Sequence, residues 1–169
     1  MIERDVLFTL AELAVALAGF SAIIGVLSTQ KRSSDVRVNS LRLQVMLETC
    51  FMVVAASLIP VLLDQFNTAP GVLWRAAAVA FLCMAIPYEF VARNRTKDMP
   101  NMTLTKMNIN TVNWGLSITA DLVLVAIVFG LVGAYSEAFY LVALLLQLTL
   151  SGILFVQFAA ETFTHPDQN

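Results

Sequence analysis

Three carboxylic acids lie well inside long apolar stretches of the sequence, where acidic side chains are unexpected. They are Glu12, Glu48 and Asp121. If these stretches cross a lipid bilayer, each acid costs roughly 2.5–3.5 kcal/mol on insertion scales, so each is a candidate for a specific role. In such a setting carboxyl groups take up protons, bind small cations, or join helices through hydrogen bonds.

Two of these acids each end a row of side chains at helical spacing. The row before Asp121 contains Lys106, Asn110, Asn113 and Ser117, and the row before Glu48 contains Arg37, Leu41 and Gln44. Residues three and four positions apart share one face of a helix. With a rise of about 1.5 Å per residue, Glu48 and Asp121 should lie at similar depths, within about one turn. If the two rows face each other, they form a polar cleft closed by two carboxylates, which is a candidate path for ions or protons.

A structural role for the same side chains is the favoured alternative. Buried polar groups also hold membrane helices together through hydrogen bonds. Gln147, Ser151 and Gln157, in the last apolar stretch, are available as partners. Binding of a lipid or of another small ligand is the third possibility.

The first apolar stretch carries a face of small residues at helical spacing. This face contains Ala11, Ala14, Ala18, Ser21, Ala22 and Gly25. Small side chains let the backbones of two membrane helices approach closely. We expect the contact to lie within the chain, with a contact to a second copy or another subunit as the alternative. Glu12, whose role we leave open, sits at the edge of this face, and Ala16 and Gly19 follow it with little bulk.

No group of residues indicates catalysis. The one histidine, His165, lies in the polar tail, which excludes a bis-histidine haem site and a zincin motif. Cys50 and Cys83 form neither a CxxC motif nor a disulfide framework. No nucleophile with an adjacent base is present. We therefore expect no enzyme activity, no cofactor and no metal site.

Composition explains the setting of the acids. The chain has 169 residues, of which 59% are hydrophobic and only 13% charged, and its mean hydropathy is +0.79. An ordinary soluble domain is about 45–50% apolar and about 25% charged. The net charge of −2 offers no basic face for nucleic acid. We predict an all-α integral membrane bundle that forms one domain over residues 1–169, with the lipid bilayer as its main partner.

Five stretches are long and apolar enough to cross a bilayer as helices. They are residues 6–28, 41–63, 72–92, 114–134 and 139–160. The first has an acidic start and is too long for a signal-peptide core, so we interpret it as a helix that is kept. Most of the ten basic residues fall in the first and third connections. Basic loops stay in the cytoplasm, so we expect the N-terminus outside and the C-terminus inside.

Two details concern the ends of these stretches. Pro100 and the pattern after it favour a fourth helix that begins near Asn101, ahead of the membrane, with an interfacial loop as the equal alternative. Arg75 is the basic residue at the outer end of the third stretch. Asp64, across the short second connection, is its expected partner.

The first half of the chain resembles a family of small, uncharacterised bacterial polytopic membrane proteins. The resemblance rests on the run AGFSAIIG at residues 18–25, on Arg42-Leu43 followed by Leu47-Glu48, on residues 58–60 (LIP) and on Trp74-Arg75. It implies a multi-pass protein of the bacterial inner membrane. The family has no assigned activity, so the resemblance implies no reaction and no ligand.

Two functions follow from these patterns. The first is a non-enzymatic accessory or assembly subunit that acts by helix packing, with itself or with another membrane subunit. The second is an oligomeric ion or proton channel, or a proton-coupled carrier, that uses Glu48 and Asp121. The ion or partner is not specified by the sequence.

Overall fold

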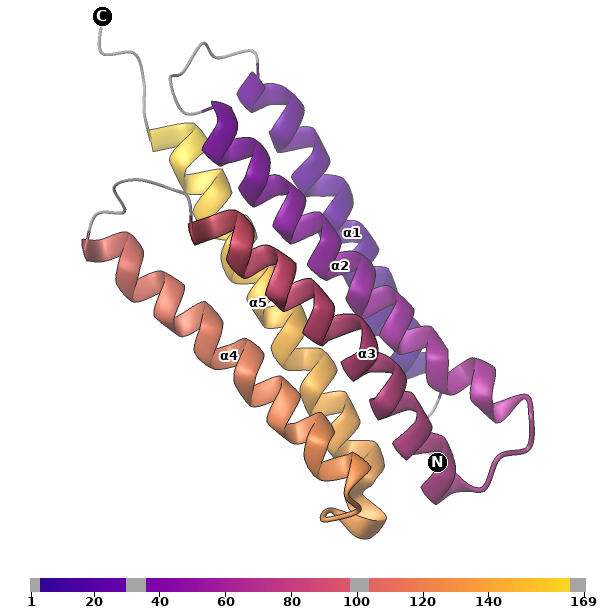
Figure 1. The fold of residues 1–169 in the computed structure, drawn as a ribbon. Helices are drawn as coiled ribbons and strands as arrows, with labels where there is room; N and C mark the ends of the chain where they lie inside the picture. Colours follow the sequence, from indigo (N-terminus) through magenta and orange to yellow (C-terminus); the bar gives the residue numbers. More distant parts are fainter. Residues whose placement is uncertain (1–3, 30–35, 98–103, 165–169) are drawn as a thin grey trace, which may run out of the picture.

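The protein is a bundle of five long helices in a computed structural model (Figure 1). The structure describes residues 4–29, 36–97 and 104–164, and within them the side chains of residues 4–26, 43–69, 71–92, 94, 113–157, 159 and 160. The elements are α1 (Arg4–Thr29), α2 (Val36–Asp64), α3 (Pro70–Lys97), α4 (Leu104–Val128), the short 3-10 helix η1 (Gly133–Tyr135) and α5 (Ser136–Thr164). The chain is 92% helical and its described residues contain no strand. The predicted all-α fold is confirmed.

The five helices run alternately in opposite directions (Figure 1). α5 packs against each of the other four, and α1, α2, α3 and α4 follow one another around it, each beside the next along the chain. The starts of α1, α3 and α5 therefore lie at one end of the bundle. We call it the acidic end, and it contains the ion pair between Arg4 and Asp64. The starts of α2 and α4 lie at the other end, which we call the basic end because the sequence there carries most of the lysines and arginines.

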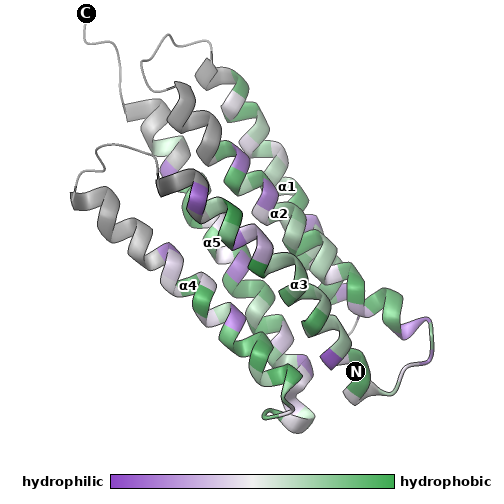
Figure 2. Ribbon diagram, in the orientation of Figure 1, coloured by the Kyte–Doolittle hydropathy of each residue, from purple (hydrophilic) through white to green (hydrophobic). Residues whose placement is uncertain are grey.

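Four of the helices are long and apolar enough to cross a membrane, which makes the chain a multi-pass membrane protein. Their apolar segments are Arg4–Val26, Leu43–Asp64, Gly71–Ala92 and Gly133–Gln157. In α4 the apolar segment among the described residues is shorter, Asn113–Val128. Large apolar side chains are exposed on all five helices, as a lipid solvent allows. Figure 2 shows that apolar residues make up much of the coloured part of each helix.

α4 differs from its predicted bounds at both ends. It begins at Leu104, well before Trp114, which agrees with a helix that starts ahead of the membrane; residues 101–103 lie outside the described part. It ends at Val128, earlier than predicted, because Gly130 has a φ of +72° and Gly133 a φ of +49°. Such left-handed backbone is the usual way in which a glycine terminates a helix. Residues 129–134 are mostly apolar, so hydropathy did not predict that the helix ends before them.

The interior has two layers. At the acidic end lies an apolar core built from α1 to α5, in which Tyr140 and Phe81 are the largest fully buried side chains. The Tyr140 ring packs against Trp74 and Phe81, and its hydroxyl donates to the backbone oxygen of Ala56 at 2.7 Å. Towards the basic end, small polar side chains replace these apolar ones.

Candidate functional site

The carboxyl groups of Asp121 on α4 and Glu89 on α3 meet in the bundle interior. The two carboxyl groups lie close enough to interact electrostatically. The hydroxyl of Ser117, one turn before Asp121, donates to Glu89 Oε1. Two carboxyl groups form a hydrogen bond only when one of them holds a proton. This carboxyl pair, Asp121 with Glu89, is therefore a place where the fold can take up a single proton.

Two buried oxygen atoms of the α4 row have no hydrogen-bond partner among the described residues. They are Oδ1 of Asp121 and Oδ1 of Asn113, which lie two turns apart on α4. Buried polar atoms are normally satisfied by protein or by water, and an unsatisfied one costs free energy. These oxygens are the acceptors with which a proton donor, a water molecule or a small cation would make contact.

The pair belongs to a wider layer of polar contacts that joins all five helices, which we call the polar belt. Its members are Ser21 and Met46, Thr49 and Tyr88, Cys50 and Ser151, and Glu89 with Ser117 and Asp121.

These contacts fix the relative heights of the helices. The Ser21 hydroxyl of α1 lies 3.4 Å from the Met46 sulfur of α2. The Tyr88 hydroxyl of α3 donates to the backbone oxygen of Val45 at 3.0 Å and lies 3.3 Å from Thr49 Oγ1. Because Glu89 is the residue after Tyr88, the same contacts also set the depth of the carboxyl pair.

Glu48 is not the partner of Asp121 that the helical rows suggested. α4 packs against α3 and α5, whereas α2 packs against α1, α3 and α5, so the rows on α2 and α4 do not share an interface. Glu48 is half-buried and accepts a hydrogen bond of 2.7 Å from Gln44 Nε2, one turn away on its own helix. The expected cleft between α2 and α4 is therefore replaced by a contact between α3 and α4.

The polar row predicted on α4 lies on the buried side of that helix. Ser117 is buried, and Asn113 and Asp121 are half-buried. Asn110 lies in α4, but its side chain is outside the described part. The row thus leads from the basic end towards the carboxyl pair.

Glu89 is the site residue that the sequence reasoning missed. It lies three residues before the end of the predicted stretch 72–92, but α3 continues to Lys97, so Glu89 is more than two turns from the helix end. One signal was available. Consecutive helices joined by a short connection are usually neighbours, so an acid in α3 was a better partner for Asp121 than an acid in α2.

The small-residue face of α1 is used inside the chain. Ala11, Ala14, Ser21 and Gly25 are buried, Ala18 is half-buried, and Ala22 is exposed at the edge. α1 packs against α2 and α5. This agrees with the expectation of an intrachain contact, and it removes this face as a docking surface for another subunit.

Other predicted contacts are rearranged. Arg4 Nη2, not Arg75, pairs with Asp64 Oδ2, at 2.7 Å. Arg75 instead lies against Gly130, where an added Cβ would come within 2.5 Å of Arg75 Nη2. Within the described residues no group of three or more histidine, cysteine or acidic side chains could hold a metal ion.

In comparisons with known proteins, no protein-family model matches the chain, and no curated protein and no solved structure is significantly similar to it.

Proposed function

We propose that the protein is a proton-coupled carrier of the membrane that binds a proton, or a small cation in its place, at Asp121 and Glu89. The observation that supports this most is the buried, donor-free Oδ1 of Asp121 beside a second carboxyl group. Two acids held together inside a bilayer are costly unless a positive charge joins them. Uptake and release of that positive charge would explain why two acids are kept inside the bilayer.

Access to the pair is expected from the basic end. Asn113 and Ser117 of the α4 row lie between Asp121 and this end, whereas the apolar core separates the pair from the acidic end. An apolar layer of packed side chains admits no continuous chain of water. A carrier that changes shape to reach the second side therefore fits the interior better than a pore through a single chain.

The proposed location is the bacterial inner membrane with the basic end in the cytoplasm. The distribution of basic residues supports this orientation, and the family resemblance supports the bacterial inner membrane. Protons or cations would then be exchanged with the cytoplasm when the carrier has the conformation described here.

The test is proton and sodium flux into liposomes that contain the purified protein. We expect Asp121→Asn and Glu89→Gln to abolish flux while the melting temperature stays the same or rises, because an amide keeps hydrogen bonding but does not exchange a proton. Glu48→Gln is the matched control. It removes a half-buried acid at similar depth on α2, outside the pair, and should leave flux unchanged.

Two results would count against the proposal. One is the absence of wild-type flux for protons, sodium and potassium at every pH and voltage tested. The other is flux that survives both Asp121→Asn and Glu89→Gln, which would place the path elsewhere.

A further inference from the structure

We infer that the Ser117 hydroxyl relays protons to the carboxyl pair, so that the charge taken up at Asp121 and Glu89 is a proton and not a metal cation. This inference rests on the proposed function, because it names the ion and the route at the same site. Ser117 acts as a proton relay, and Asn113, one turn earlier on α4, holds the water molecule that supplies it.

The first observation is the direction in which the Ser117 hydroxyl donates. Other hydroxyls of the bundle, such as those of Thr49, Ser57 and Thr149, donate to the backbone oxygen one turn earlier on their own helix, at 2.8, 2.8 and 2.7 Å. Ser117 also lies within a long helix, but its hydroxyl donates to Glu89 Oε1 on α3. Its proton is therefore directed at the carboxyl group and is not held by the backbone of α4.

The second observation is the burial of oxygen atoms on both sides of this contact. Ser117 is only 9% exposed. The Oδ1 atoms of Asn113 and Asp121, one turn before and one turn after it, are buried without a hydrogen-bond partner among the described residues. Buried oxygen atoms that no protein group satisfies are normally satisfied by bound water. Three oxygen atoms in successive turns of α4 therefore form a row of hydrogen-bonding positions that ends at the carboxyl pair.

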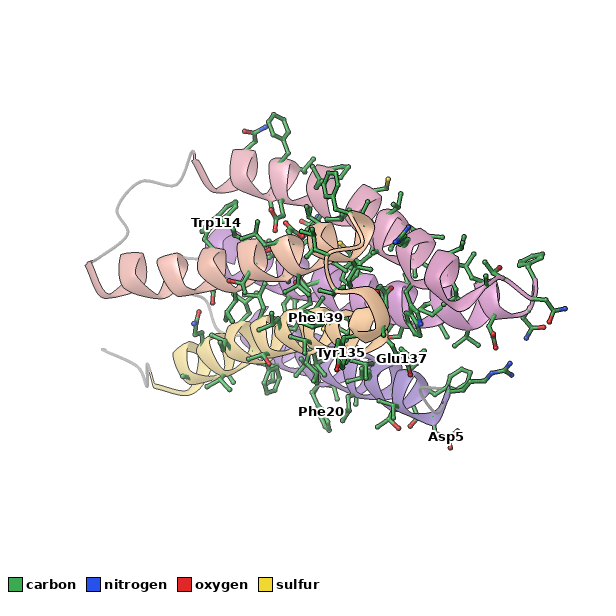
Figure 3. The ribbon with its side chains drawn as sticks, turned by 90° about the horizontal axis from the view of Figure 1, so that it is seen from below. Asp5, Phe20, Trp114, Tyr135, Glu137 and Phe139 are labelled. Carbon is green, nitrogen blue, oxygen red and sulfur yellow. The ribbon has the colours of Figure 1, made fainter. Side chains whose placement is uncertain are left out.

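The row begins nearer to the basic end than the pair does. In Figure 3, Trp114, the residue after Asn113, lies on the part of α4 towards the basic end, and Tyr135 lies beyond the other end of that helix. The apolar core around Tyr140 and Phe81 closes the opposite side. Water that enters from the basic end therefore meets Asn113 before it meets the carboxyl groups.

The spacing of the row suits one water molecule between Asn113 and Ser117. Residues four positions apart are separated by about 6 Å along a helix. Two consecutive O–H···O hydrogen bonds through one water molecule cover about 5.5 Å. Such a water molecule donates one hydrogen atom to each oxygen. A serine hydroxyl donates one hydrogen bond and accepts two, so Ser117 accepts from this water while it donates to Glu89.

The proton transfer balances as a relay. An excess proton that arrives on the water as hydronium passes to Ser117 Oγ, while the proton already on Oγ passes to Glu89 Oε1. One O–H bond forms on the serine and one breaks there, so the serine is a neutral hydroxyl before and after. The water molecule is neutral again, and Glu89 has become a carboxylic acid that shares its proton with Asp121. The reverse sequence releases the proton.

The same geometry disfavours a metal cation at the pair. Hard cations in proteins take about six or more oxygen ligands. Within the part of the chain that the structure describes, no three histidine, cysteine or acidic side chains are grouped so that they could hold one. A serine that ligated a cation beside Glu89 would also have to turn its hydrogen atom away from Oε1. A proton needs only the acceptor that Glu89 already presents to Ser117.

Hydrogen exchange of the carboxyl pair in bilayers tests the relay. When H2O is replaced by D2O, the protonated-carboxyl infrared band shifts as deuterium replaces hydrogen, and the rate of this shift measures the access of protons. We expect Ser117→Ala to keep the band but to slow its exchange about 100-fold, the lower end of what a positioned proton-transfer group contributes. Ser117→Thr, which keeps a hydroxyl, should exchange at nearly the wild-type rate. Thr119→Ala is the matched control, because it removes an exposed α4 hydroxyl that bonds only to the backbone of Gly115.

A second variant tests the water position without changing the relay hydroxyl. Asn113→Leu removes the buried oxygen atom one turn before Ser117 and should also slow the exchange, with the band kept. Sodium ions added at constant pH should leave the wild-type band unchanged, and the liposomes should show proton flux without sodium flux.

The outcomes separate this inference from the proposed function. A wild type with no titrating carboxyl band and no flux of any ion would contradict the proposed function itself. Where the wild type has the band, exchange that is equally fast in Ser117→Ala, or equally slow in Ser117→Thr and Ser117→Ala, would overturn the relay and leave the pair as the site. A wild-type band that sodium removes at constant pH would show that the pair binds a cation, which would overturn the choice of ion.

Discussion

At the scale of single residues, four intramembrane acids of similar chemistry differ in their surroundings. Glu12 faces outward, Glu48 accepts a hydrogen bond from its own helix, and Asp121 and Glu89 meet inside. The sequence predicted the depth of Asp121 and the polar row that leads to it, because helical spacing fixes both. It did not predict the partner, because spacing within one helix says nothing about which neighbouring helix that face meets.

Ser117 provides a test of the pair at this scale. Its hydroxyl donates to Glu89, so Ser117→Ala should destabilise the protein by about 0.5–1.5 kcal/mol, in the range of polar contacts between membrane helices. Thr119→Ala is the control, since the exposed Thr119 hydroxyl only bonds to the backbone oxygen of Gly115 on its own helix, at 2.7 Å. Thermal unfolding of both variants in the same detergent measures the difference. Equal melting temperatures would mean that the hydroxyl contributes nothing to the pair.

At the scale of helices, the apolar stretches predicted all five helices because a spanning segment must satisfy its backbone internally. The bounds were less predictable than the helices. α2 and α3 extend beyond the apolar stretches at their basic ends, where polar residues continue the helix outside the expected span. α4 stops at a glycine turn within an apolar sequence, which hydropathy does not detect.

The packing of α1 gives a prediction at the scale of this helix. Ala14 is fully buried against the bundle, so Ala14→Leu should cost about 1–3 kcal/mol by overpacking. Ala22→Leu, on the exposed edge of the same helix, should be nearly neutral. Unfolding midpoints in detergent compare the two. A larger loss for Ala22→Leu than for Ala14→Leu would mean that α1 is rotated relative to this arrangement.

At the scale of the whole molecule, the alternating helices place the two basic connections at one end and divide the interior into a polar belt and an apolar core. The odd number of helices and the position of the basic end follow from the sequence. The division of the interior into two layers does not follow from the sequence, because it depends on which residues of the five helices lie at the same depth in the bundle. Contacts such as Tyr88 with Val45 establish that depth.

Orientation is testable with one cysteine at each end. In a background without Cys50 and Cys83, Gln65→Cys at the acidic end should react with a membrane-impermeant maleimide from outside the cell. Gln65 is exposed and is a better choice than Asn67, whose φ of 51° suits asparagine. Ser33→Cys, which lies outside the described residues, should react only after the membrane is opened. Labelling of Ser33→Cys in intact cells would reverse the orientation.

The measurement that tests the central claim most directly is the infrared difference spectrum of the protein in bilayers between acidic and alkaline buffer. Protonated and ionised carboxyl groups absorb at different positions. We predict a protonated-carboxyl band that titrates in the wild type and is lost or shifted in both Asp121→Asn and Glu89→Gln, but is kept in Glu48→Gln. A spectrum that is the same in the wild type and in both pair variants would contradict the account, because Asp121 and Glu89 would then hold no common proton.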